Sequence, residues 1–133
     1  MKLINDFHCS IIVRTNRSLL DITKELKAKP TQFNRKGEKL SKYIDPLETN
    51  VWIFEHIYRD YSSINDALES FFSEYSNLCE TIKTSIYKDE MCIRLYVQSD
   101  YAQIVYVIST ETLRKVSSLG ISVEFSVFSW GKA

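Results

Sequence analysis

Apolar and polar residues alternate over several short segments of the chain, with the period of two that a β-strand requires. In the first of these segments, one apolar face is formed by Phe7, Cys9, Ile11 and Val13. The same alternation predicts strands at residues 91–98, 103–108 and 121–127, with a hairpin turn at 99–102 joining two of them. Residues 51–54 are apolar throughout, which indicates a strand that is covered on both faces or lies centrally in a sheet.

Three other segments repeat their apolar residues at helical spacing. Ser18 opens the first helix, which must end before Pro30 because the residue before a proline is driven out of the α region. The second predicted helix, residues 63–86, is the longest and also begins with an S-x-x-D capping pattern. Its buried stripe consists of Leu68, Phe71, Phe72, Tyr75, Leu78, Cys79 and Ile82. A short third helix is predicted from residue 109 or 110 to Gly120.

The resulting order of elements is β-α-β-α-β-β-α-β, which predicts an α+β fold. Its last six elements match the ferredoxin-like βαββαβ arrangement, preceded by an extra β-α unit. We expect a mixed or antiparallel sheet with helices packed on one face. The 133 residues fit one domain, residues 1–133, in which residues 30–50 form a long, basic loop.

Composition limits the class of protein further. Hydrophobic residues make up 44% of the chain and charged residues 26%, so the domain should fold without a disulfide or a metal. The three cysteines lie in apolar segments and are too scattered for a disulfide framework, which predicts buried, reduced thiols. Neither a signal peptide nor an apolar run long enough to span a membrane is recognisable. We therefore expect a cytoplasmic protein.

Charge is distributed unevenly, although the formal net charge is zero. Residues 1–42 hold ten Lys or Arg residues against four acidic ones, whereas the rest holds seven against thirteen. The two parts thus carry +6 and −6. Such a dipole suits either steering toward a charged partner or two oppositely charged parts that face one another in the fold.

No pattern in the sequence predicts a reaction centre. His8 and His56 are the only histidines, and neither has a Ser, Cys or Asp at a spacing that implies a triad. His8 and Cys9 are adjacent in a strand, so their side chains should diverge. The cysteines and histidines are not spaced as the ligands of a zinc site are. Gly37 is a single glycine and does not form a glycine-rich phosphate-binding loop. We expect no catalytic residue, cofactor or metal.

Nucleic-acid binding is a weaker prediction. A ferredoxin-like sheet could display Tyr96, Tyr106 and Phe128 for base stacking, and the basic stretch 24–42 could contact phosphates. No segment, however, has the aromatic signature of an RNA-recognition motif, and the pI of about 6.7 is not basic. Nucleic acid is therefore an unlikely partner.

Acidic residues gather on one face of the long predicted helix. They are Asp66, Glu69, Glu74 and Glu80. Most such faces are only a solvated surface, but this one could dock on a basic protein, since complementary charge speeds association.

Three stretches carry a family resemblance. They are Pro30-Thr31…Arg35-Lys36-Gly37-Glu38, Trp52-Ile53-Phe54, and Leu113…Leu119-Gly120-Ile121-Ser122-Val123-Glu124-Phe125. In this order and spacing the chain resembles a bacterial family described as domain of unknown function 4279. The resemblance singles out Thr31, Arg35, Lys36, Gly37, Glu38 and Trp52. It implies no catalytic residues, and each of these positions could instead be structural: Gly37 in a turn, Trp52 in the core, and Arg35 with Glu38 as an ion pair.

Two functional hypotheses follow. The first is a non-enzymatic cytosolic protein-binding domain, most plausibly an immunity-type protein that neutralises a bacterial toxin domain. Its contact surface would be the acidic helix face or the loop of residues 31–42, with Thr31, Arg35, Lys36 and Glu38. The second is a small-ligand or nucleic-acid binding module built from residues 31–42 and the sheet around Trp52 and Tyr106. The sequence leaves the oligomeric state open.

Overall fold

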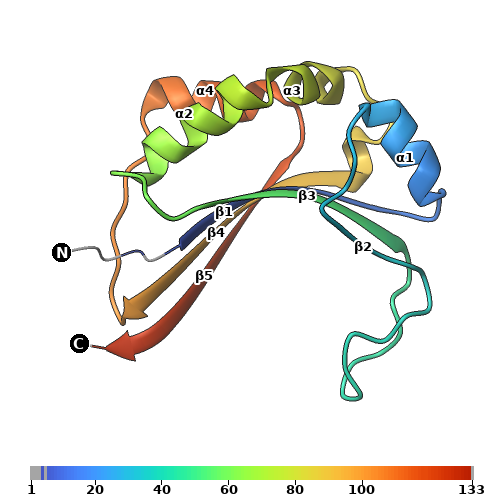
Figure 1. The fold of residues 1–133 in the computed structure, drawn as a ribbon, viewed down its shortest axis with the longest axis horizontal. Coiled ribbons are helices and arrows are strands. Elements are labelled where there is room, and N and C mark those ends of the chain that lie inside the picture. Colours follow the sequence, from blue (N-terminus) through green and yellow to red (C-terminus); the bar gives the residue numbers. More distant parts are fainter. Residues whose placement is uncertain (1–3, 5, 133) are drawn as a thin grey trace.

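The computed structural model describes residue 4 and residues 6–132, which form a sheet and a layer of helices (Figure 1). The strands are β1 (Asp6–Thr15), β2 (Gln32–Asn34), β3 (Asn50–Tyr58), β4 (Met91–Tyr101) and β5 (Ser122–Lys132). The helices are α1 (Leu19–Leu26), α2 (Ile64–Glu74), α3 (Ser76–Lys83) and α4 (Thr110–Ser118), with a 3₁₀ turn, η1 (Lys88–Glu90). The predicted α+β class is confirmed.

The sheet of the described residues is mixed, with the strand order β2-β3-β1-β4-β5. Central strand β1 pairs antiparallel with β3 and with β4, and β2 pairs antiparallel with β3. Strands β4 and β5 pair in parallel, which requires a crossover connection between them. The segment that contains α4 provides this crossover.

All four helices lie on the same side of the sheet (Figure 1), as the sequence predicts. On β1, Phe7, Cys9, Ile11 and Val13 are at most 2% exposed and belong to the core that the helices cover. Because successive strand residues point to opposite faces, the residues between them point to the other side, here called the free face. The predicted inward face of β4, with Ile93, Leu95 and Val97, belongs to the same core.

Serine caps begin three of the helices. The hydroxyl oxygens of Ser18, Ser63 and Ser109 each accept a hydrogen bond from the backbone N–H three residues later, at 3.0–3.2 Å. Each therefore satisfies one of the amide groups that the first helical turn leaves without a partner. The S-x-x-D patterns at the first two helices were thus correct indicators of where these helices begin.

The single helix predicted at 63–86 is wrong in its length and continuity. The chain forms α2 and α3 with a break at Tyr75, whose backbone angles (φ −112°, ψ 35°) are not helical, and α3 ends at Lys83. The phenol oxygen of Tyr75 lies 2.5 Å from Nδ1 of His56 on β3. The apolar repeat continues across the break because both helices cover the same face of the sheet, so periodicity alone could not reveal it.

The strand predicted at 103–108 is also wrong, as is the hairpin turn at 99–102. Strand β4 continues to Tyr101, and β5 occupies the position beside it that a hairpin strand would need. Residues 103–108 lie outside any strand, and the ferredoxin-like order is therefore not confirmed. Alternate residues of this segment still pack on the core, which explains its strand-like pattern: Ile104, Tyr106 and Ile108.

The loop predicted at 30–50 is more ordered than its sequence suggests. It contains β2, which is only three residues long and pairs with β3 at the edge of the sheet. The strand predicted at 51–54 runs from Asn50 to Tyr58 and lies between β2 and β1, so the expectation of an internal strand is confirmed. Helices cover only one of its faces.

The thiols of Cys9, Cys79 and Cys92 are buried and free, as predicted. Among the described residues, the longest helix has 11 residues, and none is long and apolar enough to cross a membrane.

Candidate protein-binding site

Residues 37–47, here called the arm, project from the sheet on the side opposite the helices (Figure 1). Two backbone hydrogen bonds close its base: the N–H of Gly37 donates to the carbonyl of Leu47 at 2.9 Å, and the N–H of Leu47 donates to the carbonyl of Glu38 at 2.8 Å. Gly37 has a φ of +91°, a conformation that glycine adopts without strain. The prediction that Gly37 serves a turn is confirmed.

A second set of contacts ties the base of the arm to the body of the domain. The Asn50 side chain accepts a hydrogen bond from the N–H of Lys36 at 2.8 Å and donates one to the carbonyl of Arg17 at 2.9 Å. One side chain thus links the arm, strand β3 and the segment before α1. The direction in which the arm projects is therefore set by the fold.

The tip of the arm carries large apolar side chains in solvent. Tyr43 is 85% exposed, Leu40 58% and Ile44 50%. The Lys42 ammonium lies 5.0 Å from the centre of the Tyr43 ring, and the N–H of Tyr43 donates to the Ser41 hydroxyl at 3.1 Å. Because the arm projects from the domain, these apolar side chains are not buried against the rest of the chain. Exposed apolar groups gathered in this way are typical of interaction sites.

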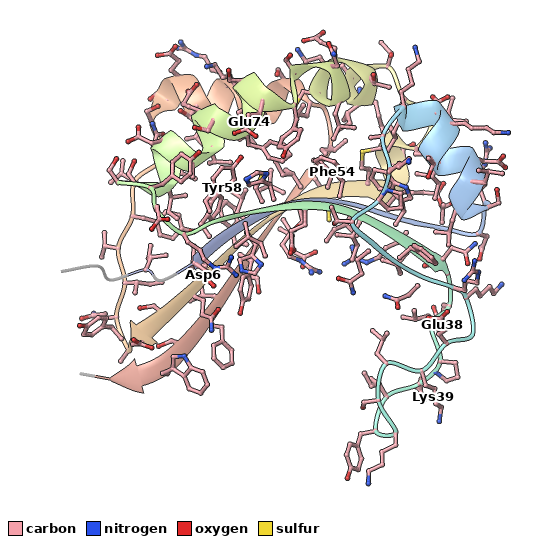
Figure 2. The ribbon with its side chains drawn as sticks, viewed as in Figure 1. Asp6, Glu38, Lys39, Phe54, Tyr58 and Glu74 are labelled. Carbon is pink, nitrogen blue, oxygen red and sulfur yellow. The ribbon has the colours of Figure 1, made fainter. Side chains whose placement is uncertain are left out.

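The predicted loop residues divide into two groups. Thr31 extends the pairing of β2 with β3, because its hydroxyl contacts the carbonyl of Ile53 and the N–H of Glu55. Arg35 lies 5.1 Å from the Phe33 ring, and among the ion pairs of the described residues none joins Arg35 to Glu38. These positions shape the base of the arm, while Glu38 and Lys39 begin its projecting part (Figure 2).

Sequence reasoning missed the tip residues. Leu40, Tyr43 and Ile44 stand in a polar stretch with no period of either kind, so they belong to no predicted core face. Their only signal was that they are large and apolar where nothing predicts burial.

The predicted acidic helix face is largely engaged within the domain. Glu69 on α2 forms an ion pair with Lys115 on α4 and accepts a hydrogen bond from the Thr112 hydroxyl at 2.7 Å. Glu80 forms an ion pair with Lys83 at 2.8 Å within α3, and the Asp66 carboxylate accepts from the Ser62 hydroxyl at 2.5 Å. Glu74 is exposed and interacts with the phenol of Tyr75, so each of the four predicted carboxylates has a partner within the domain.

The Lys115 ammonium and the Thr112 hydroxyl both hold the pKa of the Glu69 carboxyl below its usual range. In return, the Glu69 carboxylate raises the pKa of Lys115. Both shifts favour the charged forms, so the pair connects α2 with α4 at neutral pH.

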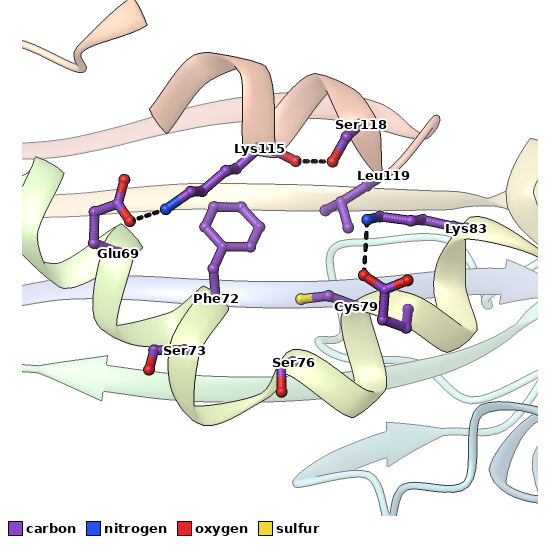
Figure 3. Close-up of a pocket in the computed structure, with 10 residues that line it drawn as sticks. Glu69, Phe72, Ser73, Ser76, Cys79, Lys83, Lys115, Ser118 and Leu119 are labelled. Atoms are coloured by element: carbon purple, nitrogen blue, oxygen red, sulfur yellow. Dashed lines mark hydrogen bonds and ion pairs between the residues drawn. The ribbon is translucent and has the colours of Figure 1, made fainter. Parts of the chain in front are cut away.

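A pocket of about 260 Å³ lies between α2, α3 and α4, directly beside this ion pair (Figure 3). Lys115 and Lys83, which line it, are paired with Glu69 and Glu80. The Cys79 thiol also lines the pocket, and burial raises its pKa to about 11. A thiol protonated at neutral pH is a poor nucleophile, so burial works against a reactive role for Cys79.

The free face of the sheet carries a network of polar side chains. The Ser10 hydroxyl donates to the Glu55 carboxylate at 2.8 Å, and His8 Nδ1 lies 3.4 Å from the same carboxylate. Towards β5, Arg94 forms an ion pair with Glu124 at 2.8 Å. These contacts pair charged and polar groups on a face that the helices leave uncovered, whereas Nε2 of His8 is buried without a hydrogen-bond partner among the described residues.

The two histidines lie on opposite faces of the sheet, and Cys9 shares its face with His56 alone. His8 points to the free face, whereas Cys9 and His56 are paired residues on the helix-covered face, as the register of β1 and β3 requires. Burial raises the pKa of the Cys9 thiol well above its ordinary value, and the nearby Cys79 and Glu55 add to the shift. Among the described residues, no group of three or more His, Cys, Asp or Glu side chains could hold a metal ion.

Two residues expected to line a ligand site lie elsewhere. Trp52 is 0% exposed on the helix-covered face, which confirms its packing role and removes it from the surface. Tyr106 packs partly buried against the same core, outside the sheet. By the register of β4 with β1 and β5, Tyr96 and Phe128 do reach the free face.

Together these features define an α+β domain with one helix-covered face, one polar free face and a projecting arm. The family model described as Domain of unknown function (DUF4279) matches residues 7–130. The chain therefore belongs to this family. No curated protein and no solved structure matches the chain.

Proposed function

We propose that this chain is a non-enzymatic, cytosolic protein-binding domain of the immunity type, which neutralises a bacterial toxin domain. In this proposal, the arm provides the principal contact. The observation that carries it is the group of exposed apolar side chains at the tip of the arm: Leu40, Tyr43 and Ile44.

The chemistry of the tip suits a protein partner. Tyrosine is among the residues that most often dominate binding energy, because it buries a large, rigid surface and can still form a hydrogen bond. Lys39 and Lys42 lie on either side of Leu40, and Asp45 follows Ile44. The complementary surface would be an apolar pocket with acidic groups opposite the two lysines and a basic group opposite Asp45.

The firmly held base of the arm supports the same proposal. Hydrogen bonds from Gly37, Leu47 and Asn50 fix where the arm leaves the sheet. A recognition segment held in place before binding loses less conformational entropy on association than a free loop. The free, buried thiols fit a cytosolic location, where such thiols stay reduced.

Ligand or nucleic-acid binding around Trp52 and Tyr106 gains no support from these two residues. Stacking on a base needs an aromatic face in solvent, and Trp52 has none exposed.

The proposal can be tested by growth protection. A toxin domain encoded beside this gene is expressed alone, with the wild-type chain, or with Tyr43→Ala. We expect the wild-type chain to restore growth and Tyr43→Ala to weaken binding by about 2 kcal/mol, or roughly thirtyfold, with a loss of protection.

Leu20→Ala is the matched control, because Leu20 is an apolar residue on α1 that is 61% exposed and far from the arm in sequence. It should protect like the wild type. Failure of the wild-type chain to protect would contradict the immunity role, and equal protection by all three chains would contradict the role of the arm.

A further inference from the structure

Strand β5 forms one edge of the sheet and, up to Ser129, where its register with β4 becomes irregular, lacks the features that usually protect such an edge. It is 11 residues long, and residues 122–131 contain no lysine, arginine or proline. The opposite edge, β2, has only three residues and is followed directly by Arg35 and Lys36. Short strands and basic residues are common protections against edge-to-edge pairing, so only the β2 edge is protected.

The side chains of β5 add an apolar row to this open edge. Val123, Phe125 and Val127 pair with Ile93, Leu95 and Val97 of β4, which places them on the helix-covered side of the sheet. They nevertheless remain 38%, 59% and 54% exposed. A neighbouring strand on the outer side of β5 would bury this row.

We propose that β5 pairs antiparallel with β5 of a second copy of this chain, so that two five-stranded sheets join into one continuous sheet. The argument for a second copy is that the strand is complementary to itself. Within residues 122–128 the only charged side chain is Glu124, and it is already paired with Arg94 at 2.8 Å and Arg14 at 3.7 Å.

Symmetry restricts the register of such a pair. Two identical antiparallel strands are related by a two-fold axis perpendicular to the sheet, so the same side of each sheet carries the helices. Paired residues point to the same side, and one residue must therefore pair with its own copy. If Glu124 paired with itself, like charges would lie opposite one another, which is destabilising.

The register centred on Phe125 satisfies all of these conditions. It places Phe125 opposite Phe125 of the second copy and Val123 opposite Val127. The exposed apolar row of one copy then packs against the same row of the other. Glu124 then lies opposite Ser126, and no like charges meet. Aromatic and β-branched residues are favourable cross-strand pairs, which makes this register the best match of the strand to its own copy.

The test is the mass of the full chain in solution, measured by sedimentation equilibrium over a range of concentrations. We expect the wild-type chain to reach twice the 15.6 kDa of one copy. Phe125→Lys should remain monomeric, since the axis would place two ammonium groups opposite one another. Val105→Lys is the control, because Val105 is 79% exposed but lies outside the strand, and it should dimerise.

Charge complementation then tests the register. Phe125→Lys and Phe125→Glu should each be monomeric alone but form a mixed dimer when combined, because position 125 faces itself. Val123→Lys with Val127→Glu in one chain should still dimerise, whereas lysine at both positions should not. Circular dichroism checks that each variant is folded.

A monomeric wild-type chain at all concentrations would overturn the proposal. So would a dimer that survives Phe125→Lys, because the interface would then lie elsewhere. Failure of the Lys and Glu variants of Phe125 to associate with each other would refute the register.

Discussion

Trp52 carries a polar N–H group into the core, and α1 supplies its partner. The indole Nε1 donates to the Thr23 hydroxyl at 3.1 Å, and that hydroxyl donates to the carbonyl of Leu19 at 3.1 Å. The pair joins β3 to α1, and it leaves the large indole ring buried without an unsatisfied donor. Such pairing is what allows tryptophan to be fully buried.

Removing this hydroxyl should therefore destabilise the domain. Thr23→Val keeps the shape of the side chain but leaves the buried indole N–H without an acceptor, which should lower the free energy of unfolding by about 1–3 kcal/mol. Thr23→Ser keeps the acceptor, so its free energy of unfolding should fall by clearly less. Urea unfolding of the three chains compares them, and equal stability of the valine and serine variants would show that the hydrogen bond contributes little.

The cysteines permit a second prediction for single residues. Burial raises the pKa of Cys9 and Cys92, and raises that of Cys79 to about 11, so all three thiols should be protonated at pH 8. Because the thiolate is the reactive form, alkylation of the folded chain should be slow, and all three should react quickly after unfolding. Mass spectrometry counts the modified sites, and rapid labelling of a folded chain would contradict the burial.

Among the elements, α4 is joined to α2 in part by contacts of the Glu69 carboxylate. The carboxylate contacts both Lys115 and Thr112, and it lies at one side of the pocket between the helices. The pKa of Glu69 is lowered in the folded chain. The stabilisation from this group is therefore fully present above the ordinary carboxyl pKa of about 4.3 and is lost as the pH falls through the lowered value.

Glu69→Gln should accordingly unfold more easily than the wild type at pH 7, and the difference should shrink as the pH falls below about 4. Glu48→Gln is a suitable control, since Glu48 is an exposed carboxylate next to the arm. Thermal unfolding of the wild type and the two variants at a series of pH values measures these differences in stability. A Glu69→Gln difference that does not change with pH would show that the ion pair is not the cause.

Element positions follow from sequence where one physical signal dominates. Alternation located β1 and β4, and serine caps located the starts of α1 and α2. The alternation of residues 103–108 wrongly predicted a strand. Every second side chain of this segment packs against the core, and that packing does not require a neighbouring strand. The break at Tyr75 left no mark on the apolar repeat, since its partner His56 comes from a distant strand.

The candidate binding site was only partly predictable for a related reason. Basic residues and Gly37 indicated that the loop had a special role, and the structure places them at the base of the arm. The tip residues Leu40, Tyr43 and Ile44 had no pattern, because solvent exposure of an apolar residue is a property of the fold. The acidic face of α2 and α3 was predicted as a surface, whereas its carboxylates mostly pair with neighbours.

At the scale of the whole molecule, one core joins every helix to the three central strands. It includes Ile22 and Leu26 of α1, Phe71 of α2, Ile82 of α3 and Val116 of α4. We therefore expect a single cooperative transition. Urea unfolding curves from far-ultraviolet and near-ultraviolet circular dichroism should coincide, and separate midpoints would contradict a single domain.

The arm and β5 lie at opposite edges of the sheet, since β2 and β3 stand at one end of the strand order and β5 at the other. The two proposed contacts therefore do not compete. A dimer through β5 would hold one arm at each end, so two partners could bind at once.

Site-specific photo-crosslinking from the tip of the arm tests the central claim most directly. A photoreactive phenylalanine analogue replaces Tyr43 in one chain and Leu20 in another, both of which are exposed apolar positions. On irradiation in cells that make the partner, position 43 should give one discrete cross-linked protein, and position 20 should give none. No product from position 43, or the same products from both positions, would contradict binding through the arm.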